Sequence, residues 1–392
     1  MSFLESSIDK PAVVLDIGHA YTKCGFAGDH GPKCIIKSEI YKNGQNQNIF
    51  KYSNENQLKE NLMEFIYRIY YKILNINSRD RKLVIVESVL NPTHVRKILT
   101  EILFKNFQVV SLFFMPSHLA ALYALGINTA LVIDCGYEDT QVMPIAEYYL
   151  MTGLFEFSSN KSSKFVYKKL EESLKLDAKV VASDKTKSLN EVKFELSDSL
   201  IEDIALRTCF VTDLKRAKSK EEGLTLKTND CNYHLPNNMV LNIPSTIREF
   251  AFESIFTDDV DSKGLANLVL DTIMKSPVDL RKRFAENIVL IGGTAMQTGF
   301  KNRLLQEIIY LINNNDNYKT LKTINDFKFH VAPCFENYTA WLGAAIFSTL
   351  EIIDTLSIQN GKYKENNEVL PDWFVLSTKF KNYDEIRQTT IN

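Results

Sequence analysis

Four uninterrupted apolar runs of strand length, each bounded by a glycine turn or an acidic residue, constrain the fold of this chain more than any other feature. The runs are AVVLDIG (12–18), KLVIVESVL (82–90), ALVIDCG (130–136) and NIVLIGG (287–293). A strand that is apolar on both faces must be covered on both sides, as in the central strands of a largely parallel sheet. The runs therefore predict buried strands between layers of helix.

Helical periodicity fills the intervals between these runs. Apolar side chains recur at helical spacing over residues 58–73, 95–103 and 300–311, and residues 117–126 are expected to form a short helix that begins at a cap residue and ends at a glycine. The alternation of strands and helices predicts an α/β architecture. The apolar stretch 111–136 is interpreted as a buried helix followed by a buried strand.

Three segments differ in character from this pattern. Residues 38–57 are polar and rich in Asn and Gln, which predicts a short, poorly packed excursion. Residues 160–240 are rich in Lys and Glu and contain amphipathic stretches, which indicates a helical subdomain outside the main sheets. The polar stretch 358–392 has Trp373 as its expected anchor.

Charge and cysteine content exclude several classes of protein. Forty-six basic and 48 acidic residues give a formal charge of −2, so no global positive field attracts nucleic acid or anionic lipid. The six cysteines show neither C-x-x-C spacing nor a zinc-like cluster, and we expect reduced thiols and no metal site built from them. The N-terminus lacks a long apolar segment, so no signal peptide or membrane insertion is expected, and the reduced thiols indicate a cytosolic or nuclear protein.

The chain contains a faint internal repeat that points to a binding site. Two strands end in the pattern apolar, apolar, Asp, x, Gly, which predicts two similar half-domains that each carry a hairpin turn. Glycine lets backbone N–H groups approach phosphate oxygens, and a carboxylate beside them acts through Mg²⁺ or its waters. The alternative for any one turn is that it only ends a strand. With a third turn, IGGT, the candidates for nucleotide contact are Asp16, Gly18, Lys23, Asp134, Gly136, Gly292, Gly293 and Thr294.

Several segments in order resemble the actin family. The first is VVLDIGHAYTKCGFAGDHGPKCIIKS, and the others are VESVLNPTHVRKILTEILF, YALGINTALVIDCG, EDIALRTCFVTDLK, IVLIGGTAMQTGF and YTAWLGAAIF. They extend from residue 12 to residue 348. Within the family, MPSHLAALYALGIN, VIDCGYED, RTCFVTDLKR and the late PDW are similar to the divergent actin-related subfamily at the pointed end of dynactin.

The resemblance implies an actin-like α/β fold with two homologous half-domains around a nucleotide cleft. One half would comprise residues 1–129 and 338–392, with a shortened small outer subdomain at about residues 38–57. The other half would comprise residues 130–337, with an outer helical subdomain at about residues 165–245.

The phosphate loops depart from the family pattern. The first loop keeps Lys23 but has His19 and Ala20 where the family has Ser and Gly; His19 could hydrogen-bond a phosphate or pack within the hairpin. In the second loop, Tyr137 replaces a carboxylate that orders magnesium-bound water. Glu138 places a negative charge where a phosphate would meet bare glycine backbone, which weakens phosphate affinity without forbidding it.

Residues for turnover and for adenine recognition are also altered. Ser117 stands where the family has a Gln that orients the attacking water, and it is better explained as a helix cap. On the adenine side the chain has Ala205 and Leu206, and Asn337 in place of a Lys. The resemblance therefore names ATP or ADP with Mg²⁺ as the expected ligand, and it leaves both binding and loss of binding open. It also implies that hydrolysis fails and that the chain has no catalytic residue.

Family members insert a loop of the small outer subdomain into an apolar groove on the neighbouring subunit. The matching groove positions remain apolar or small, although each could instead be an ordinary core residue. The inserted loop looks missing, because the roughly 20 residues of segment 38–57 would be used up by three or four short strands. The groove positions are Tyr123, Ala124, Gly126, Phe347, Leu350 and Ile352.

A receiving groove without a donating loop is the property of a cap. The expected function is a structural subunit that ends the actin-like filament of dynactin at its pointed end and supports dynein-dependent transport. Its partners would be the filament subunits and the other pointed-end subunits, in the cytoplasm at the cytoskeleton, without self-polymerisation or nucleic-acid binding. Two alternatives remain open, an active actin-fold ATPase and an actin-related scaffold in a nuclear chromatin complex.

Overall fold

The computed structural model describes residues 10–366, except residues 43, 183–184, 193, 222–227, 237, 261 and 325, and in addition Leu370 and Trp373. The chain divides into two compact units. The first unit comprises Met1–Val132, Met143–Gly153 and His330–Asn392, and the second comprises Ile133–Val142 and Leu154–Phe329. The half-domain boundaries expected from the resemblance stay a prediction, because compactness does not test common descent.

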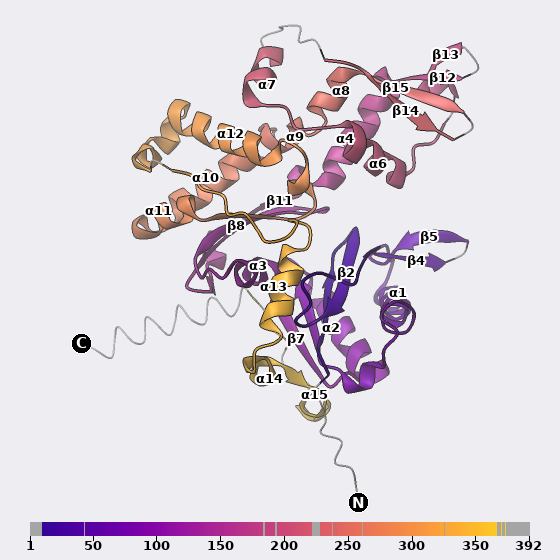
Figure 1. Ribbon diagram of the computed structural model, residues 1–392, viewed down its shortest axis with the longest axis vertical. Coiled ribbons are helices and arrows are strands. Elements are labelled where there is room, and N and C mark those ends of the chain that lie inside the picture. Colours follow the sequence, from indigo (N-terminus) through magenta and orange to yellow (C-terminus); the bar gives the residue numbers. More distant parts are fainter. Residues whose placement is uncertain are drawn as a thin grey trace, which may run out of the picture. The chain divides into compact units, whose positions relative to one another are not determined.

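A six-stranded sheet forms the centre of the first unit (Figure 1). Its strand order is β17-β7-β6-β1-β2-β3, with β1, β6 and β7 parallel and the other strands antiparallel to their neighbours. The predicted runs at 12–18 and 82–90 are the strands β1 and β6, which confirms them. The strands are β1 (Val13–Ile17), β2 (Tyr21–Phe26), β3 (Cys34–Lys37), β6 (Leu83–Glu87), β7 (Ser111–Pro116) and β17 (Ile358–Gln359).

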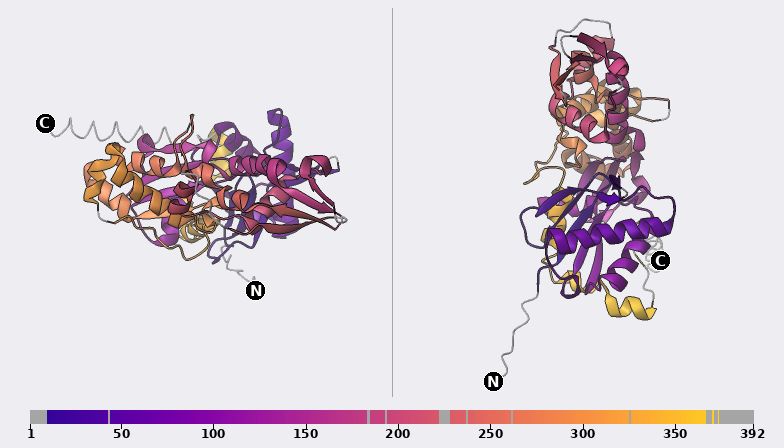
Figure 2. Two further views of the ribbon diagram at one scale, coloured as in Figure 1. Left: turned by 90° about the horizontal axis from the view of Figure 1, so that it is seen from above. Right: turned by 90° about the vertical axis from the view of Figure 1, so that its right-hand side faces the viewer.

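Helices cover both faces of this sheet. On one face, Val13 and Leu15 belong to a buried cluster with residues of α1 (Glu55–Arg68) and α2 (Thr93–Glu101), and α1 runs across the strands (Figure 2). On the other face lie α3 (Ser117–Leu125) and α13 (Thr339–Phe347), where the buried Trp341 indole N–H donates to the Val14 carbonyl at 3.0 Å. Because successive side chains of a strand point to opposite faces, coverage of both faces explains the uninterrupted apolar runs.

Local sequence sets the ends of the helices. The Asn54 side chain caps α1 by accepting the Gln57 N–H at 2.9 Å. The apolar stripe predicted over residues 58–73 continues beyond α1 through a π-helical turn, η1 (Ile69–Ile73), and α2 continues through η3 (Ile102–Asn106) in the same way. The helix expected over residues 117–126 is α3, which ends at Gly126 with φ +66°.

The expectation for residues 111–136 is incomplete. The segment begins with the strand β7, which is followed by α3 and then by the strand β8 (Ala130–Cys135). A short buried strand and a buried helix are both continuous apolar segments, so hydrophobicity alone does not separate them.

The polar segment after β3 forms a hairpin of β4 (Glu39–Lys42) and β5 (Gln45–Asn48), drawn at the side of the first unit in Figure 1. The connection between the two strands consists of residues 43 and 44 alone. The prediction of poor packing is wrong, because Ile40 and Ile49 are buried in the core with α1. Ile40 lies within β4 and Ile49 directly follows β5, so the polar composition of the whole segment is misleading.

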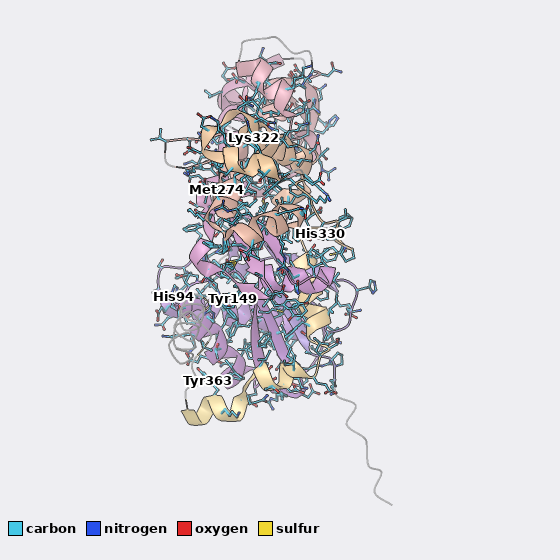
Figure 3. All side chains as sticks on the ribbon, turned by 90° about the vertical axis from the view of Figure 1, so that its left-hand side faces the viewer. His94, Tyr149, Met274, Lys322, His330 and Tyr363 are labelled. Atoms are coloured by element: carbon cyan, nitrogen blue, oxygen red, sulfur yellow. The ribbon has the colours of Figure 1, made fainter. Side chains whose placement is uncertain are left out.

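The C-terminal part of the first unit returns to its core. It contains α14 (Ile352–Leu356) and α15 (Asn360–Asn366), and Tyr363 of α15, labelled in Figure 3, packs its ring 4.9 Å from that of Phe104. The Trp373 indole N–H donates to Glu87 Oε1 at 2.9 Å, and the same carboxylate pairs with Arg96 Nε at 2.9 Å. The anchor predicted at Trp373 is confirmed, and Trp373 is held by the buried ion pair of Glu87 and Arg96.

The second sheet has the strand order β10-β9-β8-β16, with β11 paired to β9. The predicted runs at 130–136 and 287–293 are β8 and β16, and the stripe at 300–311 is α12, which confirms all three. The unit division falls within β8 and β9. The elements are β9 (Thr140–Ala146), β10 (Tyr149–Leu150), β11 (Glu156–Ser158), β16 (Ile288–Ile291), α10 (Leu265–Lys275), α11 (Val278–Glu286) and α12 (Phe300–Asn314).

The region expected to be a helical subdomain also contains a four-stranded antiparallel sheet, with the order β13-β12-β15-β14. Its strands are short and partly polar, so the charged helices around them dominate the composition. The elements are α4 (Ser163–Asp177), β12 (Lys179–Ala182), β13 (Lys185–Ser188), α5 (Leu189–Val192), α6 (Asp198–Thr208), α7 (Leu214–Glu221), β14 (Cys231–Leu235), β15 (Met239–Ile243), α8 (Ser245–Phe250) and α9 (Glu253–Phe256). Short 3₁₀ turns are η2 (Ser78–Asp80), η4 (Thr152–Leu154), η5 (Ser159–Lys161), η6 (Thr294–Met296) and η7 (Asp316–Thr323).

Candidate functional site

The first candidate loop is the β1–β2 hairpin of the first unit. Asp16 and Lys23 are directly opposite each other across the two strands, and Lys23 Nζ lies 2.9 Å from Asp16 Oδ2. The Gly18 N–H donates to the Tyr21 carbonyl at 3.2 Å, and a Cβ at Gly18 would lie 2.7 Å from that oxygen. The turn therefore requires glycine, and the charge of Lys23 is already balanced by Asp16.

His19 packs within this hairpin. Its ring centroid lies 4.5 Å from that of Phe50, and its carbonyl accepts a hydrogen bond from the Asn48 side chain at 2.6 Å. Ser38 Oγ donates to the Gly18 carbonyl at 2.6 Å from the start of the same segment. Of the two roles expected for His19, these contacts support the packing role.

The second and third candidate loops come together within the second unit. Gly292 has φ +95°, and a Cβ there would lie 2.2 Å from the Cys135 carbonyl oxygen and 2.8 Å from Asp134 Oδ1. Thr294 Oγ1 donates to the Gly136 carbonyl at 3.0 Å. A Cβ at Gly293 would have no atom within 4 Å, so this glycine faces open space. The residues Asp134, Gly136, Gly292 and Thr294, which the sequence analysis grouped as turns of one site, are therefore neighbours in the structure.

Helix α4 supplies contacts that sequence reasoning missed. Lys164, at its start, places Nζ 2.9 Å from both carboxylate oxygens of Glu138 in the β8–β9 loop. The backbone N–H groups of Ser163 and Lys164 donate to the carbonyls of Gly136 and Tyr137, at 3.3 and 3.0 Å. No local sequence pattern marks this pairing, because 26 positions separate Lys164 from Glu138.

These contacts test whether the loop fits a phosphate. A phosphate needs free N–H donors and a nearby cation. Here the Gly136 N–H is bound to the Asp139 carbonyl at 2.9 Å, and Lys164 is bound by Glu138. Burial, and then the charges of Asp198, Glu138 and Glu202, raise the pKa of the neighbouring Tyr137. One N–H donor of the loop and the nearest lysine are therefore already bound within the protein.

The residues expected to affect turnover and base recognition lie as follows. Ser117 was expected to cap α3, but Pro116, with its fixed φ, holds the cap position. Ser117 is the first helical residue and is 8% exposed, and its Oγ lies 3.4 Å from His118 Nδ1. On α6, Ala205 is buried and Leu206 is exposed. Asn337 is half-buried in the first unit, just before α13.

The expected groove residues gather on the first unit at the ends of α3 and α13. The Tyr123 ring lies 4.8 Å from that of the buried Phe347, and Leu350 and Ile352, which follow α13, are 45% and 51% exposed. Ala124 is half-buried beside Tyr123, and the exposed Gly126 ends α3. We call Tyr123, Phe347, Leu350, Ile352 and the added Tyr148 the Tyr123 patch. The alternative of a core position holds for Phe347 but not for Leu350 or Ile352.

Sequence reasoning missed the tyrosines of the β9–β10 turn. Tyr148 stacks on Tyr123 with ring centroids 5.0 Å apart, and Tyr149, labelled in Figure 3, is 40% exposed. Glu147 and Tyr148 both have positive φ, at 49° and 62°, which is costly for residues other than glycine. Two adjacent tyrosines after a predicted strand could have indicated an exposed aromatic turn.

Among the described residues, none of the helices is both long enough and apolar enough to cross a membrane.

Comparison with known proteins gives a consistent family match. The family model described as actin matches residues 8–370. The chain is 27% identical to actin-related protein 10 of Dictyostelium discoideum, over 97% of this chain and 93% of that protein. It is 28% identical to actin-related protein 2 of Arabidopsis thaliana, over 87% of this chain and 92% of that protein.

Proposed function

Since this chain belongs to the actin family, we propose that it is a non-catalytic structural subunit that caps the pointed end of the actin-like filament of dynactin. In that role it supports dynein-dependent transport along microtubules, in the cytoplasm and at the cytoskeleton. The observation that carries the proposal is the two-residue connection between β4 and β5 on a unit that keeps an exposed apolar patch.

The Tyr123 patch supports a receiving surface. Leu350 and Ile352, which follow α13, are exposed, and the rings of Tyr148, Tyr123 and the buried Phe347 lie with successive centroids 5.0 and 4.8 Å apart. Contiguous apolar surface with aromatic anchors is typical of protein–protein contacts. A neighbouring filament subunit is the partner that family membership suggests for this surface.

The β4–β5 hairpin supports the missing donor. A loop that reaches into a neighbour needs residues beyond those used by its strands, and only residues 43 and 44 lie between Lys42 and Gln45. The remainder of the segment is committed to the fold, since Ile40 and Ile49 are buried and Lys42 pairs with Glu60 at 3.2 Å. One pole would thus accept a subunit while the other could not continue the polymer.

The proposal assigns no ATP hydrolysis to the chain. Members of the actin family typically bind a nucleotide with Mg²⁺, and ATP or ADP would be the nucleotide here. Ser117 is too short to position water where a glutamine would. Steady-state ATPase measurements on the wild type and on Ser117→Gln test this point. Robust turnover by the wild type would defeat the non-catalytic proposal in favour of an active ATPase.

The capping proposal is tested with purified full-length chain and actin-like filaments of dynactin. We expect substoichiometric chain, added at the pointed end, to stop subunit addition there, and we expect the chain alone to stay monomeric in light scattering. Long fibres of the chain alone, or unchanged growth at that end, would contradict the proposal. Residues within 38–57 and 165–245 would be left for other pointed-end subunits, which crosslinking within intact dynactin would identify.

A further inference from the structure

The β8–β9 loop is held by groups of the second unit itself. The Gly136 carbonyl accepts two hydrogen bonds, from Thr294 Oγ1 at 3.0 Å and from the Ser163 N–H at 3.3 Å. The Gly136 N–H donates to the Asp139 carbonyl at 2.9 Å and closes the turn. Both polar groups of the central glycine are therefore bound within the protein.

The start of α4 is also satisfied from within. The first N–H groups of a helix lack partners in the helix and often receive an anion. Here the Ser163 and Lys164 N–H groups bind the Gly136 and Tyr137 carbonyls, and the Ser162 side chain accepts the Phe165 N–H at 3.4 Å. The loop itself takes the position that an anion could otherwise fill.

Charge follows the same arrangement. The Glu138 carboxylate binds Lys164 Nζ through both oxygens at 2.9 Å, and 34% of the Glu138 side chain is exposed. Asp198 and Glu202 of α6 lie close enough to Tyr137 for their charges to act on its hydroxyl. A phosphate that approached Tyr137 would meet three carboxylates and a lysine whose charge is already balanced.

We propose that Glu138 is a built-in anion that replaces a nucleotide phosphate at this loop, so that the chain orders the loop without nucleotide. Its carboxylate neutralises Lys164 and links the β8–β9 loop to α4, which are tasks that a bound phosphate could otherwise perform. The inference deepens the proposed structural role, on which it rests. It predicts that the wild-type chain does not saturate with Mg²⁺–ATP at micromolar concentrations.

Three variants of the full chain separate charge from structure. Glu138→Gln removes the negative charge at nearly constant size, and Lys164→Ala removes its partner. Glu171→Gln is the matched control, because Glu171 forms an ion pair with Lys175 on the same helix, α4, away from the loop. Equilibrium dialysis with radiolabelled ATP and Mg²⁺ measures binding, and hydrogen exchange measures protection of the loop amides.

We expect no saturation of the wild type and of Glu171→Gln, and at least about tenfold tighter binding by Glu138→Gln, because a like charge has been removed. Lys164→Ala should lose loop protection without gaining affinity. Saturation of the wild type at micromolar ATP, or no gain in Glu138→Gln, would overturn the inference. If both loop variants fail to fold, hydrogen exchange of the wild type with and without Mg²⁺–ATP still decides, since added loop protection would refute it. None of these results alters the capping assay, so the two proposals can fail separately.

Discussion

Gly343 of α13 lies against the backbone of Ala120 of α3 so closely that a Cβ on Gly343 would stand 1.7 Å from the Ala120 carbonyl oxygen. Both helices cover one face of the six-stranded sheet, so this contact sets the distance between the two helices. We expect Gly343→Ala to lower the free energy of unfolding by about 3 kcal/mol, because either helix must move. Urea unfolding of the full chain measures the change.

The matched control for this substitution is Gly361→Ala in α15, where a Cβ would meet no atom within 4 Å. Alanine there should raise the free energy of unfolding by up to about 1 kcal/mol, since glycine loses more backbone entropy in a helix. Equal destabilisation by both substitutions would show that the contact of Gly343 with Ala120 is not the cause.

Gly292 is expected not to tolerate a side chain, because of its positive φ as well as its close contact with the Cys135 carbonyl. Gly292→Ala should cost about 3 kcal/mol of unfolding free energy, since both the backbone conformation and the Cys135 carbonyl oppose a Cβ. The neighbouring Gly293 has no atom within 4 Å of the same position, so Gly293→Ala should change stability by less than about 1 kcal/mol. Thermal unfolding of the pair tests the geometry, and a similar loss in both variants would contradict it.

The buried pair of Glu87 and Arg96 should be sensitive to loss of one charge. The side chains of both are 3% exposed, so Glu87→Gln removes a buried carboxylate charge that pairs with Arg96 and should cost about 3 kcal/mol. Trp373→Phe removes only the indole donor and should cost about 1 kcal/mol. As a control, Glu101→Gln breaks the exposed pairs with Lys59 and Lys105 and should cost less than about 1 kcal/mol in chemical denaturation.

Stability should fall on mild acidification because of His118. Burial lowers the pKa of His118 in the folded chain from 6.5 to about 3. Below pH 6.5 the unfolded chain binds a proton at His118 that the folded chain does not, so this group lowers the free energy of unfolding as pH falls, with a slope that approaches about 1.4 kcal/mol per pH unit. Denaturation of the wild type and His118→Gln at two pH values in this window should show a smaller decrease in the variant, and equal decreases would refute the assignment.

The exposed part of the Tyr123 patch should affect assembly rather than folding. Leu350→Asp and Ile352→Asp should each change unfolding free energy by less than about 0.5 kcal/mol, because both residues are about half exposed. Each should weaken binding to the filament end by about tenfold or more, because a buried charge would lack a partner in the contact. Val278→Asp on α11, at a residue 77% exposed outside the patch, is the control and should bind like the wild type.

Much of the fold follows from patterns in the sequence, and the failures have identifiable causes. The runs that became β1, β6, β8 and β16 were recognisable because burial on both faces demands continuous apolar residues. The strand β7 was not separated from α3, since the apolar segment continues from one into the other. The strands β12 to β15 are short and lie among charged helices, so their pattern is weak.

The candidate site divides in the same way. The order of the glycine turns correctly groups Gly292 with Asp134, because turns at strand ends of one sheet meet at one edge. The partner of Glu138 could not be found, since only the folded chain brings Lys164 to it. The stack of Tyr148 on Tyr123 depends on a turn with two positive φ values at residues that rarely adopt them.

The short connection between Lys42 and Gln45 also bears on how many copies of this chain each assembly contains. On the proposed function, a protomer that is closed at one pole enters each assembly once, whatever its concentration. Counting copies of this chain would therefore amount to counting completed ends.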